Sequence, residues 1–219
     1  MYFKSRAEAG RILADQLDDY EGKNCSVIAL SRGGVLIGGQ IASKLHSNLM
    51  LLLAEQIILP GEPEPVAAVT SDNAFTENSL YSIGEIEEFE MEFYNYIQEE
   101  RFQKLHKLHL LLGTKGEIDK AKLRHHTVIL TSDGLNTGFS VEIAINYLKS
   151  ISFKKLVVAT TFSTPEAYER LRVLSDELYC LSMVENFLGV DHYYEDNAIP
   201  DVDKLMEYCS NISLHWDKN

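Results

Sequence analysis

The chain contains 219 residues, of which 45% are hydrophobic and 24% charged, so it can bury a core of its own, and we expect a single domain spanning residues 1–219. Its formal net charge of −13 argues against broad binding of nucleic acid or of an anionic membrane, but it is compatible with small anionic ligands held by local donors. No apolar run approaches the ~20 residues of a membrane-spanning helix, the first residues lack the apolar stretch of a secretory signal, and the three cysteines indicate neither disulfides nor a zinc site, so we expect a cytoplasmic protein.

The first part of the chain alternates helices and strands. Ser5 begins a capping-box pattern, and the apolar residues that follow at helical spacing predict a first helix. The apolar run at residues 25–30 predicts a buried strand, which ends at a Ser-Arg-Gly-Gly turn, and the helical spacing of residues 35–45 is followed by a second apolar strand at residues 49–53. Such units build parallel sheets, and their ligands bind at the carboxyl ends of the strands.

The rest of the chain continues this alternation after one long helix. Residues 66–69 predict a short strand, and residues 85–112 predict an amphipathic helix whose acidic start and basic end complement the helix dipole. A helix with Thr164 as its cap is expected between two of the later strands. These later strands are predicted at residues 127–131, 156–162 and 178–183.

The loop that follows residue 132 has the features of a phosphate site. A strand that ends in small residues and feeds a helix points several N–H groups, and the positive end of the helix dipole, at one spot. The loop also carries two glycines and two hydroxyl side chains, namely Gly134, Gly138, Thr137 and Ser140. Asp133 accepts hydrogen bonds and therefore matches sugar hydroxyls or Mg²⁺. The pattern predicts a site for a sugar phosphate such as ribose 5-phosphate, with an ordinary strand-to-helix turn as the alternative.

Residues 128–140 resemble the phosphoribosyl-pyrophosphate (PRPP) signature of type I phosphoribosyltransferases, in which apolar residues precede two acids and a Thr-Gly-x-Ser/Thr loop. Residues 30–35, Leu-Ser-Arg-Gly-Gly-Val, are similar to the pyrophosphate loop of the same family, and above all to that of a bacterial group with Leu-Pro-Arg-Gly-Gly-Val there. The resemblance extends to about Asp201. It implies the α/β fold of that family, a parallel sheet flanked by helices, with a variable hood contributed by about residues 73–112 and the C-terminal tail.

The resemblance also implies a role for each loop. It implies that Asp133 binds the ribose hydroxyls and a Mg²⁺ ion, and that Arg32 helps to neutralise the charge that grows on the departing pyrophosphate. Asp133 and Arg32 are therefore the predicted catalytic residues, and for Arg32 the alternative is an ordinary surface arginine in a turn. The predicted substrate-binding residues are Arg32, Gly33, Gly34, Asp133, Gly134, Leu135, Asn136, Thr137, Gly138, Phe139 and Ser140.

Three places depart from the family pattern. Ser132 stands where the signature usually has the first acid, and the loss of a charge-assisted contact typically removes ~1.5–3 kcal/mol. Glu55 and Gln56 stand where the bacterial group tends to have Arg-Lys, so an acid would lie near the pyrophosphate. Asn136 stands where purine-salvage members have an acid, so purine salvage is not supported.

We expect a protein that binds PRPP or another small-molecule phosphoribosyl substrate with Mg²⁺ and transfers the phosphoribosyl group with release of pyrophosphate. The alternative is a catalytically degenerate protein that senses PRPP or a nucleotide, as the missing acid at Ser132 would favour. An RNA-binding regulator on the same fold would need a basic face, which the net charge opposes. The resemblance makes a homodimer possible, and the sequence does not specify the acceptor.

Overall fold

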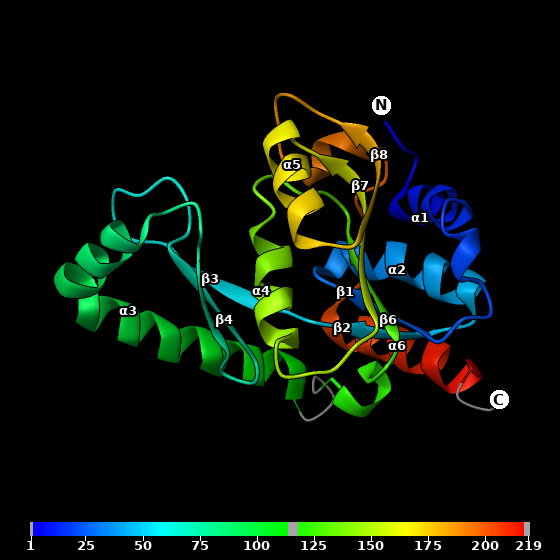
Figure 1. The fold of residues 1–219 in the computed structure, drawn as a ribbon, viewed down its shortest axis with the longest axis horizontal. Helices are drawn as coiled ribbons and strands as arrows, with labels where there is room; N and C mark the ends of the chain where they lie inside the picture. Colours follow the sequence, from blue (N-terminus) through cyan, green and yellow to red (C-terminus); the bar gives the residue numbers. More distant parts are fainter. Residues whose placement is uncertain (1, 114–117, 217–219) are drawn as a thin grey trace.

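The structure is a computed structural model that describes residues 2–113 and 118–216. A five-stranded sheet in the order β2-β1-β6-β7-β8 forms its centre (Figure 1). Every neighbouring pair in this sheet runs parallel, which confirms the predicted fold class. The strands are β1 (Cys25–Ala29), β2 (Asn48–Leu51), β6 (Thr127–Ser132), β7 (Lys155–Ser163) and β8 (Glu177–Met183).

Helices cover both faces of this sheet, as Figure 1 shows. One face carries α1 (Arg6–Asp15), α2 (Arg32–Leu45) and α6 (Val202–Trp216), and the other carries α4 (Phe139–Leu148) and α5 (Pro165–Leu174). Successive side chains of a strand point to opposite faces, so Val27 belongs to the first apolar core and Ile28 to the second. Because both faces are covered, β1 and β6 are buried along their whole length, and this explains their continuous apolar runs.

The predicted caps lie where the helices begin. The Ser5 side chain accepts a hydrogen bond from the N–H of Glu8, and Thr164 caps α5 in the same way. Ser31 accepts from the N–H of Gly34 at 2.8 Å, so α2 begins at Arg32, three residues before the predicted start. The Ser-Arg-Gly-Gly turn is therefore the first turn of a helix.

A second, antiparallel sheet of order β3-β4-β5 and the long helix α3 (Ile83–Leu112) form the hood, which projects from the side of the main sheet (Figure 1). The small sheet consists of β3 (Ala54–Ile57), β4 (Ala67–Thr70) and β5 (Phe75–Glu77). The prediction included β4 and α3 but neither β3 nor β5. The hood thus begins near residue 54, earlier than the expected residue 73.

The C-terminal segment, which the resemblance assigned to the hood, folds as α6 and packs on the main sheet. Val202, Leu205 and Cys209 are buried in the core that α6 shares with α2 and β2. The Ser213 hydroxyl donates to the carbonyl oxygen of Leu49 at 3.2 Å. The apolar residues of this segment recur at helical spacing, and burying them against the sheet accounts for its position. None of the helices in the described ranges is both long and apolar enough to cross a bilayer.

Candidate functional site

The two predicted loops meet at the carboxyl ends of β1 and β6. These strands pair in parallel, so the chain leaves both of them at the same edge of the sheet. The Ser31 hydroxyl, at the start of α2, donates to Asp133 Oδ1 at 2.6 Å. A Cβ atom built on Gly33 would lie 1.8 Å from Asp133 Oδ2, so the helix start and the carboxylate are in direct contact. The structure therefore places the two loops side by side.

Asp133 lies in a buried ion pair that the sequence did not reveal. Its exposed fraction is 5%, and its Oδ2 accepts from Arg6 Nε at 2.7 Å. Arg6 lies in the first turn of α1 and is 2% exposed. Its two terminal nitrogens bond to Asp191 Oδ1 at 2.6 Å and to Asn197 Oδ1 at 3.1 Å. Burial alone would lower the pKa of Arg6, but the hydrogen bonds and charges of the two carboxylates outweigh it and raise the pKa.

Tyr194 adds a further contact to this group. Its ring lies under the Arg6 guanidinium, 4.5 Å from ring centroid to Cζ. Its hydroxyl donates to the Asp133 carbonyl oxygen at 3.0 Å and lies 2.7 Å from the Thr161 hydroxyl. Burial raises the pKa of Tyr194, so the phenol stays neutral and keeps its donor. The main chain and the side chain of Asp133 are thus both fixed.

The loop before α4 presents unpaired donors. Gly138 caps the helix with a φ of 78° and no side-chain cap, a conformation that favours glycine. Within the described ranges, the N–H groups of Asn136, Thr137, Gly138 and Ser140 have no acceptor. They lie at the positive end of the helix dipole, so the geometry suits an anion.

The side chains of this loop differ in whether they are accessible to a ligand. Those of Leu135 and Phe139 are buried in the apolar cores, so these two residues can offer only their backbone to a ligand. The Thr137 hydroxyl accepts a long hydrogen bond of 3.4 Å from the N–H of Phe139. Ser140 is half-buried and lines a small cavity of about 90 Å³. Polar contacts from the side chains would therefore come from Thr137, from Ser140 and from Asn136, which is exposed and lines the hollow next to Thr137.

Two hollows adjoin the loops, and Leu188 borders both. One, of about 490 Å³, is lined by Asp133, Arg6 and Arg32. The Arg32 side chain is exposed and forms no ion pair or hydrogen bond with any residue of the described ranges. The other hollow, of about 470 Å³, adjoins Thr137. A ligand that binds both loops thus has open space beside Asp133 and beside Thr137.

The acid expected to repel the pyrophosphate points away from the loops. In β3, Glu55 forms an ion pair of 2.7 Å with Lys107 of α3. Its neighbour Gln56 is neutral and lines the small cavity next to Ser140. Side chains alternate along a strand, so the two residues face opposite sides. The departure at these positions therefore places no unpaired negative charge at the loops.

The side chains around Asp133 do not form a magnesium site of their own. Both oxygens of Asp133 already accept hydrogen bonds, and Ser132 offers a hydroxyl that donates to the Gly134 carbonyl oxygen at 3.0 Å. Across residues 2–113 and 118–216, no cluster of three or more His, Cys, Asp or Glu side chains is arranged to hold a metal ion. Mg²⁺ binds through several oxygen ligands, so an ion at these loops would depend on oxygens of the bound phosphates.

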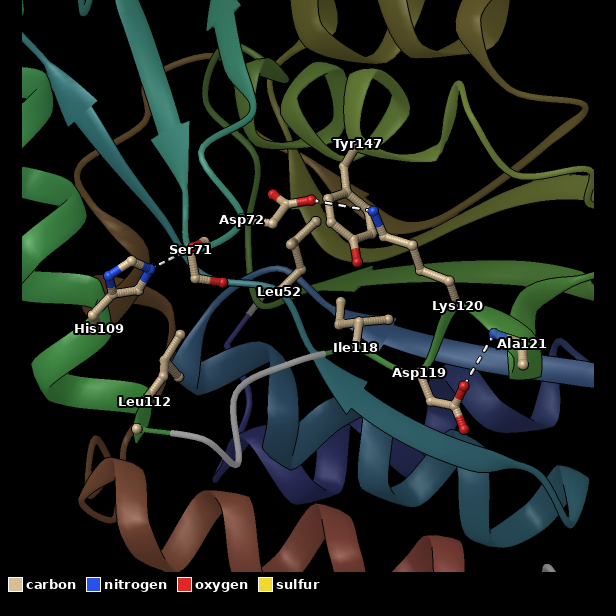
Figure 2. Close-up of a pocket in the computed structure, with 11 residues that line it drawn as sticks. Leu52, Ser71, Asp72, His109, Leu112, Ile118, Asp119, Lys120, Ala121 and Tyr147 are labelled. Carbon is tan, nitrogen blue, oxygen red and sulfur yellow. Dashed lines mark hydrogen bonds and ion pairs between the residues drawn. The ribbon is translucent and has the colours of Figure 1, made fainter.

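The largest cavity described, of about 770 Å³, contains none of the predicted residues (Figure 2). Its polar groups are bonded to one another. Lys120 pairs with Asp72 at 3.3 Å and lies 4.7 Å from the ring centroid of Tyr147. The His109 ring bonds through Nε2 to the Ser71 carbonyl oxygen at 2.7 Å. This cavity therefore offers a charged ligand few free partners, unlike the loops at Asp133.

The fold and the two loops define an α/β protein that presents two helix N-termini and an exposed arginine at the carboxyl edge of a parallel sheet. The chain belongs to the phosphoribosyl transferase domain family, because the family model "Phosphoribosyl transferase domain" matches residues 2–195. This match confirms the family suggested by the sequence motifs.

Relatives of known sequence or structure agree with this assignment. Two proteins named "Putative phosphoribosyl transferase", from Mycobacterium tuberculosis strains CDC 1551 and H37Rv, are each 24% identical over 208 residues, which is 94% of this chain and 46% of theirs. The chain thus spans about half the length of these curated relatives. The crystal structure of TT1426 from Thermus thermophilus is similar over 99% of both chains, with 26% identity and a TM-score of 0.71.

Proposed function

We propose that this protein binds PRPP at the two loops and transfers its phosphoribosyl group to an acceptor with release of pyrophosphate. The observation that carries the proposal is that the cap of α2 bonds to the Asp133 carboxylate, while the loop that begins at Asp133 leads into the N-terminus of α4. A ligand with phosphate groups at both ends of a ribose would match that arrangement.

The α4 end suits the 5-phosphate. Its unpaired N–H groups and the hydroxyls of Thr137 and Ser140 can donate to phosphate oxygens, and the helix dipole favours the negative charge. The positive φ of Gly138 turns the backbone into the helix at this point. This end would hold the part of the ligand that does not react.

The α2 end suits the pyrophosphate. In the reaction the bond between ribose C1 and a pyrophosphate oxygen breaks, the acceptor forms a new bond to C1, and the electron pair leaves with the pyrophosphate. Arg32 and the N–H groups of the first turn of α2 can stabilise that growing negative charge. Within the ranges described, Arg32 has no other counter-charge to satisfy.

Asp133 suits the ribose. An ionised carboxylate offers about four acceptor positions, and here Ser31 and Arg6 occupy one on each oxygen. The remaining positions can accept from ribose hydroxyls that enter the hollow beside Asp133. Since Ser132 supplies no second carboxylate, Asp133 alone would provide the acidic contact.

Calorimetric titration with PRPP and with ribose 5-phosphate, with and without MgCl₂, tests binding, and pyrophosphate release over a panel of bases tests transfer. We expect Arg32→Ala to lower the affinity for PRPP by about 10-fold or more, as when one charge-assisted contact is lost, and to leave the affinity for ribose 5-phosphate unchanged. Thr137→Ala should lower the affinity for both ligands. Arg11→Ala is the matched control, because Arg11 is an exposed arginine of α1 with no bonded partner in the described chain.

The outcomes separate the two candidate functions. Binding together with pyrophosphate release would establish a transferase. Binding without release over the whole panel would favour a sensor of PRPP or a nucleotide. No binding of PRPP, ribose 5-phosphate or a nucleotide would overturn the proposal.

A further inference from the structure

Arg6 is a buried cation near the start of the chain that contacts the predicted site. It stands 127 residues before Asp133, yet its Nε donates to the Asp133 carboxylate at 2.7 Å. Its remaining nitrogens bond to Asp191 and Asn197, which lie in the segment after β8. One guanidinium thus joins three parts of the chain that are remote in sequence.

The surroundings of this ion pair indicate a role in ligand binding and not only in stability. A buried ion pair is seldom a net source of stability, because both charges lose their water. Here the pair lies beside a hollow that Arg32 also lines, at the junction of the two predicted loops. A Cβ on Gly33 would come within 2.5 Å of Arg6 Nε, so the start of α2 packs directly on the pair.

The two hydrogen bonds on Asp133 come from different elements. Ser31, the cap of α2, donates to Oδ1, and Arg6 of α1 donates to Oδ2. A carboxylate bonded on both oxygens cannot rotate freely, so its remaining acceptor positions keep fixed directions. A side chain that is ordered before binding loses less conformational entropy when the ligand arrives.

We infer that Arg6 is a positioning residue for the ribose: it fixes the Asp133 carboxylate between the two loops and thereby lets the site distinguish a phosphorylated ribose from a bare phosphate. The inference rests on the proposed function of the same loops. It assigns to the first helix a part in ligand selection that neither loop motif contains. Arg6 also offsets part of the negative charge of Asp133 and Asp191, so phosphate groups do not approach an unpaired carboxylate.

Arg6→Lys is the decisive variant, because it keeps the positive charge beside Asp133 but loses the planar fork that reaches Asp191 and Asn197. The measurements are calorimetric dissociation constants for ribose 5-phosphate and for inorganic phosphate. We expect the affinity for ribose 5-phosphate to fall about 10-fold, as when one charge-assisted contact is lost, and that for inorganic phosphate to change less than about twofold. Arg11→Lys, on the same helix but exposed, should change neither.

A double-mutant cycle with Asp133→Asn tests whether Arg6 acts through Asp133. We expect the effect of Arg6→Lys on ribose 5-phosphate to disappear in the Asp133→Asn background. An equal effect in both backgrounds would overturn the inference, because a purely structural role of Arg6 would not depend on that carboxylate. Asp191→Ala provides a second test if Arg6→Lys fails to fold, because it removes one contact of Arg6 at an exposed carboxylate. It should also lower the affinity for ribose 5-phosphate.

The results distinguish this inference from the proposed function. If the parent prefers ribose 5-phosphate to phosphate and Arg6→Lys keeps that preference, the inference alone is wrong. If the parent binds neither ligand, the proposed function is wrong, and the inference falls with it.

Discussion

Replacing Gly33 with alanine should destabilise the protein strongly. The added Cβ would lie 1.8 Å from Asp133 Oδ2 and 2.5 Å from Arg6 Nε, far inside contact distance. The backbone at Gly33 is held by the hydrogen bond from the N–H of Gly34 to the Ser31 cap, so the carboxylate has to move and leave its partners. Overpacking typically costs about 1–3 kcal/mol and a broken buried ion pair about 3–5 kcal/mol. Both effects come from the same movement of the carboxylate and are not additive, so we expect the free energy of unfolding to fall by about 3–5 kcal/mol.

Urea unfolding followed by circular dichroism measures this loss. With a slope of about 2 kcal/mol/M, the midpoint should fall by roughly 2 M. Gly84→Ala is the matched control: Gly84 lies in α3 with no heavy atom within 4 Å of the added Cβ, so alanine there should stabilise the protein by about 0.5–1 kcal/mol. A Gly33→Ala protein within about 1 kcal/mol of the parent would refute the packing of Gly33 against the buried pair.

Three further predictions concern the rest of the domain. Thr164→Ala should lower the free energy of unfolding in urea by about 1 kcal/mol, because the Thr164 hydroxyl caps α5 through the N–H of Ala167 at 3.1 Å. Hydrogen bonds from Lys155 and Tyr20 lower the pKa of Glu177 below 4.5 in the folded protein. The carboxylate therefore stabilises the fold above the pKa of the unfolded state, and this stabilisation is lost as the pH falls through the folded pKa. On acidification, the urea midpoint of Glu177→Gln should fall less than that of the parent. Burial raises the pKa of Cys209 to about 12, so mass spectrometry should find this thiol alkylated at neutral pH only after unfolding.

The main sheet could be predicted from the sequence because its strands are buried on both faces. Continuous apolar runs at β1 and β6 leave a signal that does not depend on the rest of the chain. The hood strands β3 and β5 have no such signal. They are three or four residues long, and most of their side chains are partly or fully exposed. Their position follows from pairing with β4 and from packing near α3, which local sequence does not encode.

The two loops of the candidate site could be proposed from the sequence, because each lies within one short segment of the chain. The partners of Asp133 could not. Arg6 reaches the carboxylate from a distant segment of the chain, and Asp191 and Asn197 bond to Arg6 from another, and such contacts leave no periodic pattern. One local sign did exist: Arg6 stands in the first turn of a helix, where a cation is disfavoured by about 0.3–1 kcal/mol. A basic residue at that position indicates a tertiary partner.

The same reasoning applies to Arg32, the first residue of α2, which carries a positive charge at the positive end of its helix. The first turn of α2 contains no acidic residue to offset it. For Arg6 the offsetting charges are the carboxylates of Asp133 and Asp191, whereas Arg32 is exposed and has no such partner within residues 2–113 and 118–216. A cation and a helix N-terminus that reinforce each other without a counter-charge are stabilised when an anion binds. If pyrophosphate is that anion, Arg32→Ala should reduce PRPP affinity and at the same time stabilise the ligand-free protein slightly, and a loss of stability without ligand would argue against this account.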